Sequence, residues 1–117
     1  MDKKLLVDKW IELQSLSRDS AEANNLMWAA EEFFALTDTD PQECWDVILE
    51  VVNKTDNEWV LINLAAGPLE DLLALHPKES IVWLEREVPK NPRLKSILSG
   101  VWKNLIPDDV WERVQTL

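Results

Sequence analysis

DPQECWDVILEVVN, residues 40–53, contains the clearest helix-start signal in the chain. The carboxylate of Asp40 can accept hydrogen bonds from the free amides of a first helical turn. Pro41 suits the first helical position, where a backbone N–H is not needed, and Glu43 completes a capping box. We therefore predict a helix over residues 41–53.

Helix signals continue on both sides of this segment. Apolar residues recur at spacings of three and four, and no segment keeps the alternation of a strand for long. The predicted helices span residues 3–16, 20–36, 41–53, 56–66, 68–75, 78–87, 92–105 and 108–117. We predict an all-α fold, a compact array of seven or eight short antiparallel helices. An irregular α-solenoid of the HEAT-like kind would suit this rhythm, and a sheet is the disfavoured alternative.

Two stretches carry more specific structural expectations. Ala66-Gly67-Pro68 should break or kink the helix that begins near Asp56, because proline lacks the N–H of a helix interior. Residues 92–105 have the strongest helical period in the chain. The apolar residues that set this period are Leu94, Ile97, Leu98, Val101, Trp102 and Leu105.

The apolar faces of these helices predict the core. In the helix over residues 20–36, Met27 and Phe34 belong to the expected core side, with Phe33 and three other apolar residues. The chain has seven tryptophans, and all but Trp28 lie within helical apolar patterns. We expect most of these six to lie in the core or between helices: Trp10, Trp45, Trp59, Trp83, Trp102 and Trp111.

Length and composition narrow the class of protein. A chain of 117 residues with 46% hydrophobic residues is one domain's worth, residues 1–117, and can form a core without metals or disulfides. Its single cysteine and single histidine exclude disulfide frameworks and Cys/His zinc sites, so we expect no cofactor. We find no signal-peptide pattern and no apolar run long enough to span a membrane, and therefore expect a cytoplasmic protein.

Three segments carry a resemblance to a family. They are PQECWDVILEVV (residues 41–52), EWVLINLAAGPLEDLLALH (residues 58–76) and NPRLKSILSGVW (residues 91–102). The chain resembles an uncharacterised bacterial family of small acidic all-helical domains, over about residues 28–102, and the AAGPLEDLL block is the most specific part. It departs from that family at His76-Pro77, where the family has a glycine corner. The resemblance implies a helical fold and a bacterial source, and no activity.

The acidic residues are unevenly distributed. Asp19 to Glu50 contains nine acidic residues and no Lys or Arg, whereas residues 59–117 contain eight acidic and seven basic residues. At 100° per residue, three of the acids share a narrow arc of helix 41–53, and two lie opposite the phenylalanines of helix 20–36. These acids are Glu43, Asp46 and Glu50 on the first helix, and Glu31 and Glu32 on the second. Such a face fits a cationic protein, and the alternative is an acidic surface that only improves solubility.

Trp28 lies within the polar arc of helix 20–36, beside Glu31 and Glu32. If exposed, an indole ringed by carboxylates has the composition of an interface anchor, because tryptophan is enriched in binding hot spots and attracts cations. If another element covers it, Trp28 is a packing residue, which is the interpretation we favour. The sequence leaves both open.

Residues with catalytic potential do not form a recognisable site. Glu70 and Asp71 diverge by about 100° on a helix, and an acid at position 70 suits helix capping. His76 has no metal-ligand or triad partner in the pattern and fits the carbonyl end of a helix. Acidic neighbours raise the pKa of Cys44 rather than activate it. We expect no enzymatic activity.

These features predict a small acidic protein-interaction domain. Its net charge of −10 argues against direct binding of nucleic acid or an anionic membrane. The favoured hypothesis is an immunity or antitoxin-like protein that binds and neutralises a basic partner, for example a toxin, through Trp28 and the five acids Glu31, Glu32, Glu43, Asp46 and Glu50. The alternatives are a DNA-mimic regulator and a structural scaffold or adaptor.

Overall fold

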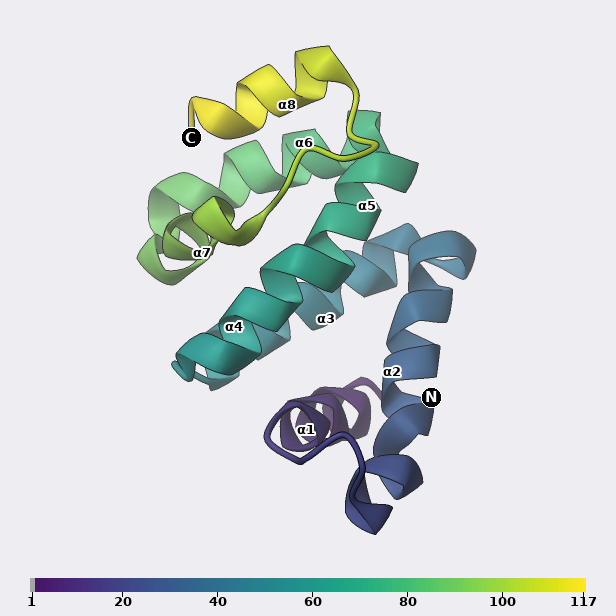
Figure 1. The fold of residues 1–117 in the computed structure, drawn as a ribbon. Helices are drawn as coiled ribbons and strands as arrows, with labels where there is room; N and C mark the ends of the chain where they lie inside the picture. The colour runs from purple at the N-terminus through teal and green to yellow at the C-terminus, as the bar shows by residue number, and fades with distance from the viewer. Residues whose placement is uncertain (1) are drawn as a thin grey trace.

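A computed structural model describes residues 2–117, which contain helices and no strand. The helices are α1 (Lys3–Gln14), α2 (Ala21–Thr39), α3 (Pro41–Lys54), α4 (Glu58–Leu64), α5 (Glu70–Leu75), α6 (Pro77–Glu87), α7 (Pro92–Ile97) and α8 (Asp108–Gln115) (Figure 1). A π-helical turn, η1 (Ala65–Leu69), joins α4 to α5, and the 3-10 turns η2 (Val88–Lys90) and η3 (Leu98–Gly100) flank α7. The all-α prediction is confirmed, and a solenoid arrangement stays a prediction.

Local capping explains where several helices begin. The side chain of Asp40 accepts a hydrogen bond from the Glu43 N–H at 3.2 Å, with Pro41 in the first turn of α3, as the sequence predicts. The second bond of the predicted capping box does not form, because the Asp40 N–H donates to the carbonyl of Leu36 in α2. Asn57 and Asn91 cap α4 and α7 in the same way, since each side-chain oxygen accepts from the amide three residues ahead. These bonds satisfy amides that have no partner within their own helix.

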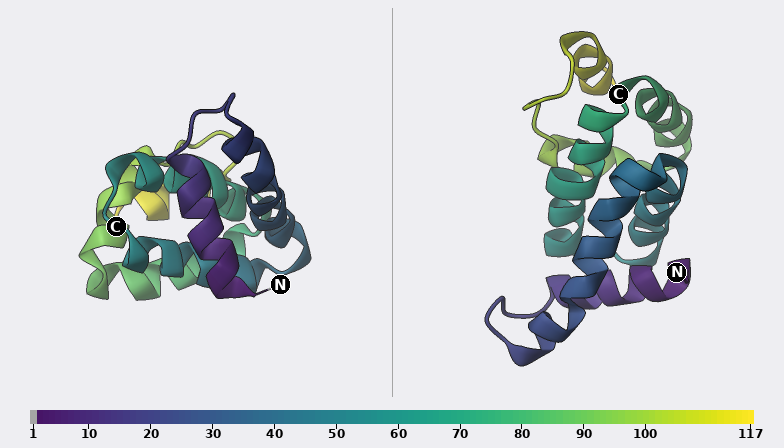
Figure 2. Two further views of the ribbon diagram at one scale, coloured as in Figure 1. Left: turned by 90° about the horizontal axis from the view of Figure 1, so that it is seen from below. Right: turned by 90° about the vertical axis from the view of Figure 1, so that its right-hand side faces the viewer.

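The helices form two groups around one core. At one end α1 crosses α2 and α3, and at the other α8 lies along α6 (Figures 1 and 2). The rod formed by α4, η1 and α5 runs between the groups and contacts α2 and α3. One hydrophobic cluster extends from Leu6 to Val114 through this rod. The Cα radius of gyration, 13.7 Å, agrees with the value of about 13 Å that a compact chain of this length should have.

The helix does not break at Ala66-Gly67-Pro68, which is one of the two outcomes that the sequence predicts, but its regular α-helical winding is interrupted there by a π-helical turn. It continues as one rod from α4 to α5, with Pro68 inside the π-helical turn, where the Glu70 N–H donates to the carbonyl of Ala65. Proline inside a regular helix removes one hydrogen bond and collides with the preceding turn. A π turn contains one extra residue, so the wider turn accommodates Pro68 without ending the helix.

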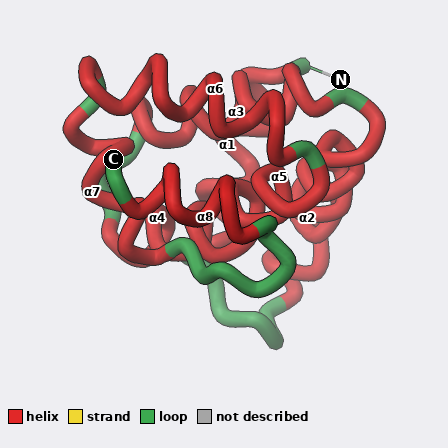
Figure 3. Tube along the Cα trace, turned by 90° about the horizontal axis from the view of Figure 1, so that it is seen from above, coloured by secondary structure: helices red, strands yellow, loops and turns green. Residues whose placement is uncertain are grey.

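The predicted helix over residues 92–105 is too long. α7 ends at Ile97, η3 ends at Gly100, and residues 101–107 form the longest non-helical connection within residues 2–117 (Figure 3). η3 approaches the rod so closely that a Cβ on Gly100 would lie 3.2 Å from the Cβ of Ala65. Glycine permits this close approach, and beyond it the chain is no longer helical, so that Trp102 and Leu105 are 70% and 86% exposed.

The core prediction is right for some aromatic residues and wrong for others. Trp10 packs edge-on against Phe33, and Trp45 stacks on Trp83, with ring centroids 5.4 and 6.3 Å apart. Trp59 is 62% exposed. Trp102 and, on α2, Met27 and Phe34 are exposed as well, against expectation. The reason on α2 is that α1, α3 and the rod cover one side of this helix and leave its outward side free.

Candidate protein-binding face on α2 and α3

The carboxylates between Asp19 and Glu50 take part in none of the ion pairs within residues 2–117. Those pairs are Lys9–Glu12, Lys54–Asp8, Lys90–Glu87, Lys103–Asp108 and Arg113–Glu85. Every acidic partner in them comes from outside the segment. The tertiary structure therefore pairs acidic and basic residues elsewhere in the chain and leaves the charge of α2 and α3 without direct neutralisation.

Glu32 and Glu43 lie together at the junction of α1, α2 and α3. They line a hollow of about 210 Å³ with Asp40 and with Lys3 from α1. One carboxylate oxygen of Glu43, Oε1, is buried and has no hydrogen-bond partner within the described residues. The sequence pattern does not place the cation Lys3 on this face, because nothing in the sequence relates residues so far apart in the chain.

Asp46 and Glu50 continue the acidic surface along the outer side of α3. Asp46 is half-buried and accepts a hydrogen bond from the Gln42 amide at 3.3 Å, whereas Glu50 is exposed. One turn further, Lys54 pairs with Asp8 of α1. The free negative charge of α3 therefore lies between its first turn and Glu50.

Trp28 and Glu31 lie on α2. Trp28 is half-buried and packs against the hydrophobic cluster, which agrees with the packing interpretation. Glu31 is exposed on the outward side of α2, within about 60° of the exposed Phe34 and not opposite it as the sequence predicts. The right-hand view of Figure 2 looks onto this side of α2, with α3 and the rod behind it. Trp28 therefore offers only part of its indole to a partner, and Glu31 is fully available.

Glu70 does not cap a helix, contrary to the sequence prediction. Because α4, η1 and α5 form a continuous rod, position 70 has no free helix start beside it. Instead, its two carboxylate oxygens accept hydrogen bonds from the backbone N–H of Trp102 and the side-chain amide of Asn104. Asn104 has a φ of 35°, in the left-handed region that asparagine tolerates. Glu70 therefore holds the connection over residues 101–107.

His76 binds a helix end, although not that of its own helix. Its Nε2 lies 2.6 Å from the carbonyl oxygen of Thr37, in the last turn of α2. An N–H at that position donates to one of the carbonyls that have no partner within α2. His76 thus ties the corner between α5 and α6 to the end of α2, which is a structural role.

Cys44 is fully buried in α3. Burial, followed by the negative charges of Asp71 and Asp40, raises the pKa of this thiol to about 12. A thiol with so high a pKa holds almost no thiolate at neutral pH and is a poor nucleophile. Within residues 2–117, no three His, Cys, Asp or Glu side chains converge closely enough to hold a metal ion.

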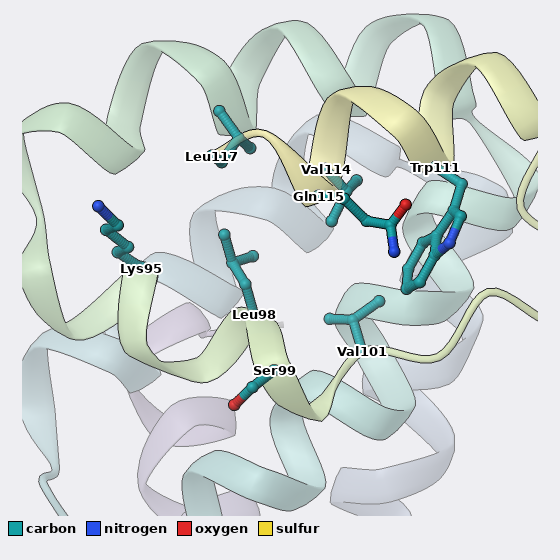
Figure 4. A pocket seen from close by; sticks show the side chains of 8 residues that line it. All are labelled: Lys95, Leu98, Ser99, Val101, Trp111, Val114, Gln115 and Leu117. Atoms are coloured by element: carbon teal, nitrogen blue, oxygen red, sulfur yellow. The ribbon is translucent and has the colours of Figure 1, made fainter.

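A pocket near the C-terminus lies between η3 and α8 (Figure 4). It has a volume of about 410 Å³, and its apolar lining residues are Leu98, Val101, Trp111, Val114 and Leu117. Its polar side chains are those of Lys95, Ser99 and Gln115, which supply no acid–base pair. The pocket does not adjoin the acidic face of α2 and α3.

None of the helices in residues 2–117 is long and apolar enough to cross a membrane. The model of a family of unknown function, DUF6869, matches residues 16–117. Comparisons with curated proteins and with solved structures give no match. The matched range includes α2, α3 and the whole rod, so the candidate face lies within it.

Proposed function

We propose that this chain, which belongs to the DUF6869 family of unknown function, is a protein-interaction domain that binds a basic partner protein through α2 and α3. The observation that carries the proposal is the segregation of charge described above. Every ion pair within residues 2–117 has an acidic partner from outside the segment Asp19–Glu50. No acidic residue inside that segment forms one of these ion pairs. Like charges held together in this way repel one another, and a cationic surface would relieve the repulsion.

The finer form of the proposal is an immunity or antitoxin-like protein in the cytoplasm that neutralises a basic toxin. Its support is the net charge of −10 together with a face that offers carboxylates and part of an indole. Charge of this kind speeds association with a cationic protein more than it adds affinity. A toxin must be blocked quickly, so fast association suits this role.

The test begins with the product of the neighbouring gene, copurified with the tagged chain. The association rate of the purified pair is then measured by stopped flow at increasing ionic strength. We expect the rate to fall at least about tenfold between low and high salt. An association rate that does not change with ionic strength, or a partner without a basic surface, contradicts the proposal. Displacement of the partner by duplex DNA would point to the DNA-mimic alternative.

Matched charge reversals locate the surface. Because one carboxylate oxygen of Glu43 is buried, the test variant leaves Glu43 in place and changes Glu31, Asp46 and Glu50 to lysine. The control variant changes three exposed acids of α6 and α8 to lysine, so both proteins have the same net charge. The control positions are Glu79, Asp109 and Glu112. Slower association in the test variant alone supports the α2–α3 face, and equal slowing in both variants contradicts it.

A further inference from the structure

The outward side of α2 carries two exposed apolar residues that the core does not use. Met27 and Phe34 are 45% and 67% exposed. The exposed acids Glu31 and Asp38 alternate with them, so that the four residues follow one another at spacings of four, three and four. At 100° per residue, their side chains lie within an arc of about 60° around the helix axis. We call Met27, Glu31, Phe34 and Asp38 the α2 stripe. At 1.5 Å per residue it is roughly 16 Å long.

A groove adjoins the stripe on the side of α4. It has a volume of about 570 Å³ and lies between the end of α1, the first half of α2, and α4. Met27 belongs both to the stripe and to this groove, where Ala23, Ala30 and Trp59 lie with it. The one charged residue that lines the groove is a cation, Arg18, so the acidic residues that attract a basic helix are those of the stripe. Trp59 is 62% exposed, so a large aromatic surface faces solvent there. Exposed aromatic and methionine side chains of this kind are typical of binding surfaces.

The charge of the stripe indicates what covers it. Spacings of four and three residues are those at which a second helix packs along a first. The carboxylates of Glu31 and Asp38 alternate with the apolar residues and have no ion pair within residues 2–117. A complementary helix therefore has apolar residues at the same spacing with Lys or Arg beside them. A second copy of this chain would bring the same carboxylates face to face, so charge disfavours it.

We propose that the α2 stripe and the adjoining groove bind a basic amphipathic helix of the partner. The inference rests on the proposed function and deepens it, because it names the structural element that the acidic face recognises. The apolar side of the partner helix contacts Met27 and Phe34 and reaches Trp59 in the groove. Its cations lie against Glu31 and Asp38.

The test uses a synthetic helical peptide of about 18 residues, long enough to cover the stripe. Leucines at spacings of four and three form one side, and lysines flank them. One control peptide has the same composition in scrambled order, and another has glutamate in place of lysine. Affinity is measured by titration calorimetry at physiological salt. We expect the amphipathic cationic peptide to bind at least about tenfold more tightly than either control.

Matched variants assign the binding to the stripe. Phe34→Ala and Glu31→Lys should each weaken binding of the cationic peptide at least about fivefold. Leu105→Ala and Glu112→Lys are the apolar and charge controls, since both residues are exposed and lie outside the stripe. Both controls should leave the affinity unchanged. Because all four side chains are exposed, folding is checked by circular dichroism and should be retained.

Each of the following outcomes overturns the inference. Equal binding of the scrambled peptide indicates attraction by charge alone, and equal affinity in the stripe variants places the contact elsewhere. Self-association of the chain at micromolar concentration, abolished by Phe34→Ala, assigns the stripe to a second copy. If the copurified basic partner still binds both stripe variants but not Asp46→Lys/Glu50→Lys, the proposed function stands and this inference fails. If no basic protein binds the chain at all, both fail.

Discussion

The carboxylate of Glu70 holds the backbone of Trp102: Oε1 accepts a hydrogen bond from the Trp102 N–H at 2.8 Å. The other oxygen, Oε2, accepts from the side-chain amide of Asn104 at 2.7 Å. Through these two bonds a residue of the central rod determines the path of the connection between η3 and α8. Hydrogen bonds to a charged acceptor are stronger than those between neutral groups.

Replacing Glu70 should loosen this connection. Because Glu70→Ala removes both acceptors near the surface, we expect a loss of about 1 kcal/mol in the free energy of unfolding. Hydrogen exchange of the Trp102 amide should accelerate more than that of amides in α3. Glu112→Ala removes an exposed carboxylate of α8 and serves as the control. Unchanged exchange at Trp102 would mean that this bond does not hold the segment.

Gly100→Ala should destabilise the protein. The new methyl group would lie 3.2 Å from the Cβ of Ala65, which belongs to the rod and cannot rotate away. Overpacking of this kind costs about 1 kcal/mol or more. A double-mutant cycle with Ala65→Gly, followed by urea unfolding, measures the coupling between the two positions. Additive effects would contradict a direct steric contact between η3 and the rod.

Cys44 should resist alkylation in the folded protein. Its pKa of about 12 leaves only about one thiol in ten thousand ionised at pH 8, and the side chain is buried. Iodoacetamide should therefore react only through unfolding, with rapid modification in guanidinium chloride as the control. Mass spectrometry follows the reaction over time. Complete labelling within minutes under native conditions would refute the assignment of Cys44 to the core.

Asp71→Asn should stabilise the protein at neutral pH. Burial, and then the charge of Glu70, raise the pKa of Asp71 in the folded state. The folded protein thus binds this proton more tightly than the unfolded chain does, and the carboxylate lowers stability as pH rises from its ordinary pKa through the raised one. Asp71 is half-exposed, so we expect a gain below about 1 kcal/mol.

The pH dependence separates this effect from a general gain in stability. The advantage of Asp71→Asn should shrink as the pH falls through the raised pKa of Asp71, and it should vanish below the ordinary pKa of aspartate, where the carboxyl is protonated in both the folded and the unfolded protein. Urea unfolding across this range measures it, with Glu112→Gln as the control. A gain that is independent of pH would mean that the raised pKa is not its cause.

The acidic face illustrates how far the candidate site follows from the sequence. Helical periodicity places Glu43, Asp46 and Glu50 on one arc of α3, because that relation depends only on neighbours along one helix. Lys3 reaches the same region only because α1 crosses α2 and α3. The exposed Met27 and Phe34 were predicted to be buried, since periodicity identifies an apolar side chain but not whether another helix covers it.

The sequence by itself determines the helical class and the start of α3, because capping by Asp40 and the position of Pro41 are interactions within a few residues. Only the tertiary structure decides how the rod passes Pro68, where α7 ends, and that Glu70 binds Trp102. The physical reason is the distance along the chain over which each kind of interaction acts. Capping and periodicity operate within about two helical turns, whereas these features arise from contacts between segments that are distant in the sequence.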